Sequence, residues 1–190
     1  MKKKALTQIA FESLSIVFAV LLALGLNSYK QAWDLQRESQ LLKKNILKEC
    51  RSNLEKLEVA IQENEDFQLF IDSLLQSDEI RGFHFSYNNE LLSSISWNFT
   101  KTSRSFQYMD PVFLTEAAEV YENQDYYMQI ANQMFEHLGD MIMQVDNIKP
   151  RTLTQTGNYY LSNLISASKN LQEDYQNFLD KNKDLEQKSE

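Results

Sequence analysis

Residues that interrupt helices are scarce in this chain of 190 residues, which has four Gly and two Pro. An all-β fold with many tight turns uses both residue types at its turns, so the composition argues against that fold class. The one cysteine, Cys50, excludes an intrachain disulfide. Cys50 stands at an apolar position of a helical pattern, where we expect a small core residue, although a thiol outside the cytoplasm can also pair with another chain.

Basic residues are also few, since 19 Lys and Arg stand against 27 Asp and Glu and the net charge is −8. A nucleic-acid-binding surface neutralises phosphates with Lys and Arg side chains. We therefore expect no nucleic-acid partner.

Motifs for catalysis, phosphate binding and metal binding are missing from the sequence. The two histidines, His84 and His137, have no partner at zinc-binding spacing, and there is no glycine-rich phosphate loop or nucleophile elbow. A series of carboxylates at every third position lacks the Glu-x-x-His pairs of a di-iron bundle, and we interpret it as a solvated face: Glu116, Glu119, Glu122 and Asp125. The sequence thus predicts a non-enzymatic protein with no catalytic residue, cofactor or metal.

What the chain does have is an apolar run at residues 13–26, shortly after a basic start. No charged residue lies between Ser13 and Tyr29, and the apolar stretch extends back to Ala5 if Glu12 is included. A bilayer core about 30 Å thick requires about 20 helical residues, so residues 5–29 are long enough to span it. We predict a single uncleaved membrane anchor. A cleaved secretory signal, with residues 23–25 as the cleavage site, and a buried helix of a soluble protein are the alternatives.

The flanks of the apolar run suggest its orientation. Lys2, Lys3 and Lys4 form a compact basic cluster before it, whereas the basic residues after it are spread out and interleaved with acids. The positive-inside tendency therefore favours an N-terminus in the cytoplasm. Tyr29 and Trp33 lie one helical turn apart where the opposite membrane surface is expected, and amphipathic rings favour that level.

Glu12 is the residue that stands out chemically in the apolar stretch. A carboxylate inside a membrane helix is costly, so it is a candidate for proton movement or for a polar contact between helices. Glu12 also lies about two turns from Lys4, so a simpler interpretation is that it reaches the membrane interface or pairs with that lysine.

A narrow apolar stripe with helical spacing continues beyond the anchor, at Leu47, Cys50, Leu54, Leu57 and Ile61. No Pro or Gly falls between residues 26 and 81, so one continuous helix from the membrane to about Leu75 is predicted. The stripe fits two uses. It is a candidate interface between copies in a coiled coil, and it also fits packing against the later helices of the same chain, which we favour because it covers barely two heptads.

Several connections follow this long helix. Residues 82–89 are interpreted as a connector, and Asn88 or Asn89 is expected to cap a short helix that starts at Glu90. Residues 101–107 are polar and predict a turn-rich linker.

Two further helices complete the predicted fold. Asp110-Pro111 is a sharp helix start, and the apolar pattern continues to about Asn147, where Pro150 closes the helix. Residues 151–158 are interpreted as a loop, after which the strongest helical period in the chain begins near Asn158.

The predicted fold is all-α, with the transmembrane helix continuing into a long helix and an antiparallel helical bundle of about three long helices and one short one. We divide the chain into a basic flank and anchor (residues 1–29), a helical extramembrane domain (30–180) and a charged flexible tail (181–190).

Aromatic residues are numerous in the second half of the chain. They are most simply core residues, and a groove for a ligand or peptide is the alternative interpretation: Trp97, Phe99, Phe106, Phe113, Tyr121, Tyr126, Tyr127, Tyr159 and Tyr160.

A family resemblance is carried by Glu12 before the apolar run and by Ala23, Leu24 and Asn27 at its end, followed by the Leu41-Leu42 step. This pattern, with the short stretches at residues 102–109 and 114–121, resembles a family of small membrane proteins common in Bacteroidota, catalogued as domain of unknown function 6090. The chain departs from the family pattern at Tyr29, where the family has Trp, and at Ser15 and Phe18, where a Gly is usual. The resemblance covers about half the chain and implies a single-pass anchor with a helical extramembrane domain, but no activity.

We therefore expect a single-pass protein of the bacterial inner (cytoplasmic) membrane, with the bulk of the chain in the periplasm. Its expected role is that of a scaffold or accessory subunit that binds another envelope protein or its own copies. A helical domain that senses a ligand or peptide, and an ion-coupled membrane component that uses Glu12, are the alternatives.

Overall fold

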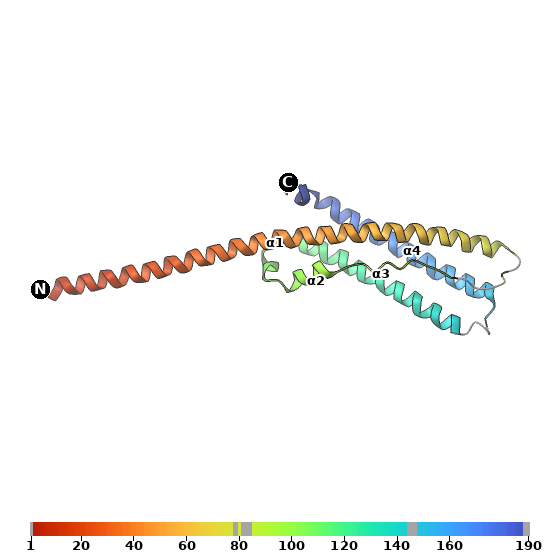
Figure 1. Ribbon diagram of the computed structural model, residues 1–190, viewed down its shortest axis with the longest axis horizontal. Helices are drawn as coiled ribbons and strands as arrows, with labels where there is room; N and C mark the ends of the chain where they lie inside the picture. The colour runs from red at the N-terminus through yellow and green to blue at the C-terminus, as the bar shows by residue number, and fades with distance from the viewer. Residues whose placement is uncertain (1, 78–79, 81–84, 144–147, 188–190) are drawn as a thin grey trace.

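The computed structural model describes residues 2–77, 80, 85–143 and 148–187, with the side chains of residues 2–11, 13, 142, 186 and 187 left undescribed. The described residues are helical or irregular, and they include no strand. The helices are α1 (Lys2–Gln76), α2 (Ile95–Thr102), the 3₁₀ helix η1 (Arg104–Tyr108), α3 (Pro111–Met143), α4 (Pro150–Lys181) and α5 (Lys183–Gln187) (Figure 1). The predicted all-α fold is confirmed.

Helix α1 is a single uninterrupted helix, as predicted. Its N-terminal part stands alone, and its C-terminal part packs against the rest of the chain (Figure 1). The sequence explains the continuity, because Gly25 is the only Gly or Pro between Lys2 and Gln76.

Helix α4 lies antiparallel to both α1 and α3. Its start contacts the end of α1, where Arg151 donates to the carbonyl oxygens of Leu75 (2.8 Å) and Ser77 (3.3 Å). Its end contacts the start of α3, where Lys181 pairs with Glu116 at 3.0 Å. The helices α1 and α3 consequently run parallel, and α4 packs against both (Figure 1).

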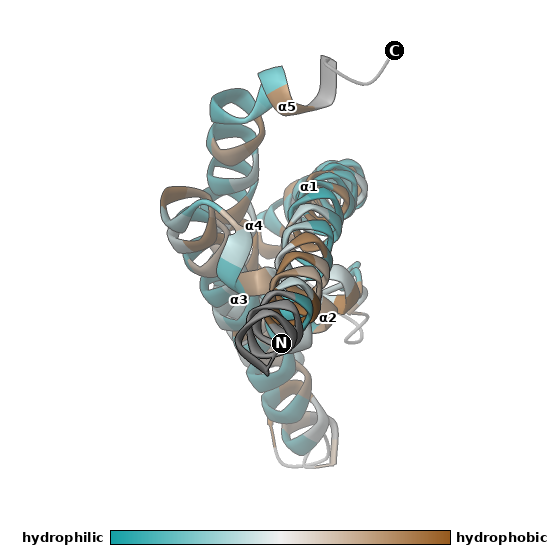
Figure 2. Ribbon diagram, turned by 90° about the vertical axis from the view of Figure 1, so that its left-hand side faces the viewer, coloured by the Kyte–Doolittle hydropathy of each residue, from teal (hydrophilic) through white to brown (hydrophobic). Residues whose placement is uncertain are grey.

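An irregular segment, residues 85–94, together with α2 occupies the place where a four-helix bundle has its fourth helix. The segment bridges α1 and α3, because the Ser93 carbonyl accepts hydrogen bonds from Asn53 of α1 (2.8 Å) and Gln124 of α3 (3.4 Å). Viewed along the molecule from its N-terminal end, α2 and α4 lie on different sides of α1 (Figure 2). The chain thereby closes a core around which α1, the segment with α2, α3 and α4 are arranged.

The core is built from the apolar faces of the three long helices. Its fully buried side chains include Ile46, Leu47 and Leu57 of α1, Tyr127 and Met134 of α3, and Leu153, Leu161, Leu164, Leu171 and Tyr175 of α4. Burying an aliphatic side chain contributes about 1.5–3 kcal/mol relative to leaving it in water. The apolar stripe of α1 therefore packs into one core with the apolar faces of α3 and α4.

Side chains cap the start of α3 and the end of α1. Asp110 caps α3, since its carboxylate accepts from the backbone N–H of Val112 at 2.9 Å, which confirms the predicted helix start. The end of α1 has no glycine cap and no basic residue in its own last turn. Arg151 supplies both a donor and a positive charge to the last carbonyls of α1.

The predicted start of the short helix at Glu90 is wrong, because α2 begins at Ile95 after Ser94. Tertiary hydrogen bonds hold residues 88–93 out of a helix.

The predicted linker at residues 101–107 is also wrong, since α2 reaches Thr102 and η1 follows at once. In η1, Ser103 accepts from the Ser105 N–H at 3.1 Å and Ser105 is buried.

The interpretation of Pro150 as a helix terminator is likewise wrong. Pro150 is the first residue of α4, a position where its missing N–H costs nothing. The predicted loop at 151–158 forms the first turns of α4, with Leu153, Thr154 and Gly157 buried. The predicted end of the preceding helix at Asn147 lies outside the described residues, as does part of the predicted connector at 82–89.

Part of the predicted tail is helical. After Asn182 the chain forms α5, and Leu185 packs against the core. The last residues of the tail lie outside the described residues.

Candidate functional site

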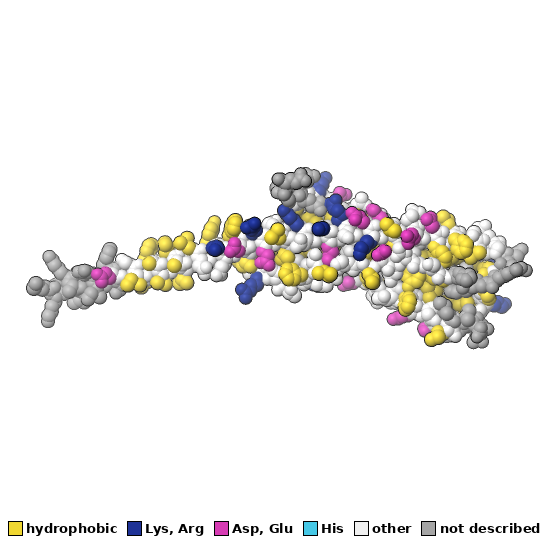
Figure 3. All heavy atoms as spheres, viewed as in Figure 1, with side chains coloured by type: hydrophobic (Ala, Val, Ile, Leu, Met, Phe, Trp, Pro, Cys, Tyr) yellow, Lys and Arg dark blue, Asp and Glu magenta, His cyan; other side chains and the backbone are white. Residues whose placement is uncertain are grey.

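The isolated part of α1 is the most distinctive surface of the molecule. We call residues 14–29 the stem, because no other described part of the chain covers this apolar window. Its large apolar side chains are exposed, with Phe18 67% and Leu21 61% accessible. Figure 3 shows hydrophobic side chains gathered along it, and charged ones on the domain beyond. By length and composition the helix suffices to cross a membrane, and an N-terminal signal segment meets the same description.

The residues predicted to mark the membrane surfaces lie on α1. Tyr29 is 75% and Trp33 56% exposed, so both rings are available at the level predicted for a bilayer surface. Lys2, Lys3 and Lys4 belong to the first turns of α1, and their side chains are not described. Glu12 is an exposed residue of the same helix.

Between the stem and the domain, α1 passes through a short polar stretch, residues 30–37, which we call the collar. Most of its side chains are exposed, and the domain begins just beyond it, where Ser39 and Leu42 are buried. Ser103, at the start of η1, donates to Glu38 at 3.3 Å. From Tyr29 to Glu38 the helix rises by about 13 Å. The collar therefore holds the domain about two turns beyond the stem.

The candidate interface stripe lies inside the domain. Leu47, Cys50 and Leu57 are fully buried, Ile61 is 7% exposed, and Leu54 packs against the same core. The stripe packs inside the chain's own bundle, with α4 as its main neighbour, which is the use that we favoured from the sequence. Cys50 is the small buried core residue that we expected, and its thiol is free.

A buried polar cluster interrupts this apolar core where α1, α2, α3 and α4 meet. Its members come from four parts of the chain: Glu49, Cys50, Asn53, Ser93, Tyr121, Gln124 and Tyr175. Trp97 of α2 stacks on Tyr121 with ring centroids 5.4 Å apart and planes at 4°. Polar groups taken out of water are costly unless they are hydrogen-bonded, so the bonds within the cluster decide its effect on stability.

Glu49 receives three hydrogen bonds, one each from the irregular segment, α2 and α3. Its carboxylate accepts from the Ser93 hydroxyl (2.7 Å), the Ser96 backbone N–H (2.9 Å) and the Tyr121 hydroxyl (2.6 Å). The Ser96 N–H lies in the first turn of α2, and Ser94 makes no side-chain cap there. A carboxylate of α1 therefore serves as the cap of α2.

The environment of Glu49 lowers its pKa. Burial by itself raises the pKa of this carboxyl, but the hydrogen bonds from Ser96, Tyr121 and Ser93 stabilise the charged form and outweigh burial. A surface groove of about 270 Å³, lined also by Lys48 and Lys56, leaves the carboxylate half-buried.

The other titratable groups of the cluster are held neutral. Burial raises the pKa of the Cys50 thiol to about 12. Burial also raises the pKa of Tyr121 and of Tyr175, and the negative charge of Glu49 adds to both shifts. An unreactive thiol and two neutral phenols are suited to holding the fold together, whereas nucleophilic chemistry requires lowered pKa values.

Two buried asparagines fasten the irregular segment to α1. Asn53 donates to the Ser93 carbonyl (2.8 Å) and accepts from the Ser93 N–H (2.9 Å). Asn64 does the same with Asn88, at 2.9 and 2.7 Å. The rise of α1 between the two asparagines is about 16 Å, and an extended chain from Asn88 to Ser93 also spans about 16 Å. The match explains why this segment is extended and runs antiparallel to α1.

The aromatic set divides into core and surface residues. Trp97, Phe113, Tyr121 and Tyr127 are buried, whereas Phe99, Tyr126 and Tyr159 are exposed and Phe106 and Tyr160 are half-buried. Tyr126, Tyr159 and Tyr160 line a surface groove between α3 and α4. Three of the nine aromatic residues therefore line one surface groove, and the other six lie elsewhere.

The histidines and carboxylates form no metal site among the described residues. His137 is exposed on α3 and stacks on Tyr160, with ring centroids 5.3 Å apart. His84 lies outside the described residues. The carboxylates at 119, 122 and 125 are exposed, in agreement with a solvated face, and Glu116 pairs with Lys181.

Sequence reasoning missed the polar cluster, although a signal for it was present. Asn53 and Asn64 fall in phase with the apolar stripe of α1, where a polar residue requires a buried partner. Their partners are backbone groups more than twenty positions away, which no local pattern identifies.

Comparison with known proteins gave no match to a family model, a curated protein or a solved structure. The resemblance to the Bacteroidota family stays a prediction.

Proposed function

We propose that this chain is a single-pass membrane protein whose helical domain acts as a non-enzymatic scaffold or accessory subunit. In this proposal the stem spans the bilayer, the collar crosses the membrane surface, and the domain contacts another envelope protein or a second copy of the chain. The observation that carries the proposal is the continuity of α1 from the exposed stem into the core of the domain.

The exposed stem supports the membrane part of the proposal. Apolar side chains that nothing in the described chain covers are costly in water, whereas lipid covers them without any further contact. The rings of Tyr29 and Trp33 follow the stem at the level where aromatic residues prefer to lie. The basic cluster at Lys2, Lys3 and Lys4 supports an N-terminus in the cytoplasm and a domain on the periplasmic side of a bacterial inner membrane.

The uninterrupted helix also argues for an anchor that stays attached. A cleavage after residue 25 would cut α1 within a regular helix, whereas signal cleavage requires an accessible, extended segment. We therefore favour the uncleaved anchor over the cleaved signal.

The continuity of α1 from the stem into the domain supports the scaffold part of the proposal. A flexible linker would only localise the domain, but a helix shared by stem and core fixes the height and rotation of the domain relative to the bilayer. The groups of the polar cluster hold the elements together, through hydrogen bonds such as Tyr121 to Glu49 and Tyr175 to Gln124. Exposed apolar side chains on the domain, among them Leu69, Ile95 and Val112, offer contact points for a partner.

The test is site-specific photo-cross-linking from the surface of the domain in living cells. A cross-linking residue at position 69, 95 or 112 is expected to give a discrete adduct with a partner or with a second copy. Replacing the collar by Gly and Ser keeps its length but removes its rigidity, so these adducts should be lost.

The matched control replaces the collar by an equally long Ala/Glu/Lys helix, with Trp33 kept. The adducts should persist there, because length and rigidity are both preserved. Adducts that survive the Gly/Ser replacement would show that rigid presentation is irrelevant. A chain that gives no adduct at any position would contradict the scaffold function.

A further inference from the structure

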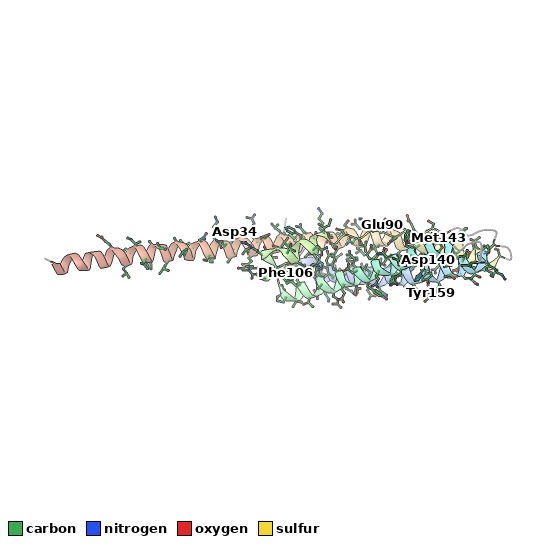
Figure 4. The ribbon with its side chains drawn as sticks, turned by 90° about the horizontal axis from the view of Figure 1, so that it is seen from below. Asp34, Glu90, Phe106, Asp140, Met143 and Tyr159 are labelled. Atoms are coloured by element: carbon green, nitrogen blue, oxygen red, sulfur yellow. The ribbon has the colours of Figure 1, made fainter. Side chains whose placement is uncertain are left out.

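A second surface of the domain has the composition of a ligand site. The groove between α3 and α4 has a volume of about 520 Å³, within the range of about 300–1,000 Å³ that is usual for small-molecule sites. It lies beside the distal half of the domain, away from the stem. Tyr159, one of its lining residues, is labelled there in Figure 4.

The rings of the groove are of two kinds. Tyr126 and Tyr159 are 62% and 64% exposed, so much of each side chain is accessible to a ligand. Tyr160 is held between neighbours, with its ring centroid 5.3 Å from that of His137 and 5.6 Å from that of Tyr159. A ring fixed by its neighbours offers a flat apolar face at little cost in conformational entropy.

The polar groups of the groove are almost all uncharged. Amide side chains from both helices line it, namely Gln133, Asn163 and Asn170, together with the hydroxyl of Ser166. None of the described lining residues is Asp, Glu, Lys or Arg, on a protein in which 24% of residues are charged. Amides and hydroxyls can each donate and accept hydrogen bonds, whereas charged groups would select an ion.

We infer that this groove binds a neutral oligosaccharide. A sugar ring has an apolar face that packs on an aromatic ring, and a rim of hydroxyls that both donate and accept. Tyr159 and Tyr126 supply the accessible rings, and Asn163, Asn170 and Gln133 supply the paired donors and acceptors. An anion or a cation finds no fixed opposite charge here.

A peptide fits this groove less well than a sugar. A helical peptide requires a continuous apolar floor, and an extended peptide requires a free strand edge. The buried floor is limited to Met134 and Ala167, and two helices present no strand edge. The inference does not depend on the stem spanning a membrane, so its failure would leave the proposed anchor untouched.

The experiment uses the full chain in nanodiscs of phosphatidylcholine, because detergents with sugar headgroups would compete for the groove. Calorimetric titration is carried out with tetra-N-acetylchitotetraose, cellotetraose and maltotetraose, and with an uncharged, end-blocked tetrapeptide as the alternative ligand. At least one sugar is expected to bind with a Kd of about 1 mM or tighter. Tyr159→Ala should weaken that binding about tenfold, while Tyr159→Phe keeps the ring and most of the affinity.

Tyr108→Ala is the matched control, because Tyr108 is an exposed tyrosine of η1 at the opposite end of the domain. It should bind the sugar as the unchanged chain does, and thermal unfolding should be the same in all three variants. Absence of binding by every sugar, equal binding by Tyr159→Ala, or binding of the tetrapeptide alone would overturn the inference.

Discussion

Glu49 is the position where one substitution tests how the domain is held together. Its carboxylate joins α1 to the first turn of α2 through Ser96, and to α3 through Tyr121. Glu49→Gln keeps the size of the side chain and removes its charge. Glu49→Ala removes every acceptor, and leaves the Ser93 and Tyr121 hydroxyls without this partner.

The expected magnitude follows from the three hydrogen bonds. A hydrogen bond to a charged group contributes about 1.5–3 kcal/mol, and loss of a helix cap costs about 1 kcal/mol. Because the carboxylate is half-buried, water can replace part of what is lost, so we expect well under the sum of three such bonds. We expect Glu49→Ala to lower the free energy of unfolding by about 2–3 kcal/mol, and Glu49→Gln by about 1 kcal/mol.

The effect should depend on pH in a definite direction. The pKa of Glu49 in the folded protein is lowered from its ordinary value of 4.5, so the folded state favours the carboxylate. The stabilisation is fully present above the ordinary pKa, and it is lost as the pH falls through the lower folded pKa. The difference in stability between the unchanged chain and Glu49→Gln should therefore shrink below about pH 4.5.

The assay is urea unfolding of the full chain in nanodiscs, followed by the fluorescence of Trp97, which stacks on Tyr121 inside the domain. Trp33 is replaced by Phe in every protein compared, so that the tryptophan fluorescence comes from Trp97 in the domain alone. Glu55→Gln, at an exposed position of the same helix, is the matched control and should change stability by less than about 0.5 kcal/mol. Equal stability of Glu49→Gln and the unchanged chain at neutral pH, or a difference that grows in acid, would refute the reasoning.

Three further predictions concern the core of the domain. The Cys50 thiol is buried with its pKa raised to about 12, so a maleimide should label it far more slowly in the folded protein than in urea; equal labelling rates would contradict its placement. Asn64→Ala should release Asn88 and speed amide hydrogen exchange at residues 85–90 in mass spectrometry, while exchange in α4 stays slow; unchanged exchange would show that the two bonds do not hold the segment. Leu57→Ala should lower the free energy of unfolding in urea by about 2–5 kcal/mol. Val59 is 53% exposed on the same helix, so Val59→Ala should lower it by less than about 0.5 kcal/mol. Similar losses for the two variants would contradict the burial of Leu57.

The parts of the fold that local signals determine were predictable from the sequence. The length of α1 follows from the absence of Pro and from a continuous apolar pattern, and its observed end at Gln76 lies one residue from the prediction. The start of α3 follows from Asp110-Pro111, because capping is decided within one turn.

The parts that distant contacts determine were not predictable. Residues 88–93 have the composition of a capped helix start, but Asn64 and Asn53 hold the backbone extended. Pro150 has the same local chemistry as a helix terminator and as a first helical residue, and the burial of Leu153 and Gly157 in the turns that follow is not visible in the local sequence.

The candidate sites show the same division. The stem and the aromatic residues that flank it could be recognised from the sequence alone, because a long uncharged apolar run is typical of a membrane-spanning segment. The acceptors of the polar cluster are single residues of common types, such as Glu49 and Gln124, whose importance arises only when four elements meet. The groove likewise depends on α3 and α4 being brought side by side.

The central claim is that α1 joins a membrane anchor to the domain without cleavage. The most direct test is the intact mass of the protein recovered from cell membranes after washing at alkaline pH, which removes proteins that do not span the bilayer. We predict that the protein in the washed membrane pellet retains residues 5–29. A protein that begins after residue 25 and is recovered in the soluble fraction would contradict the account.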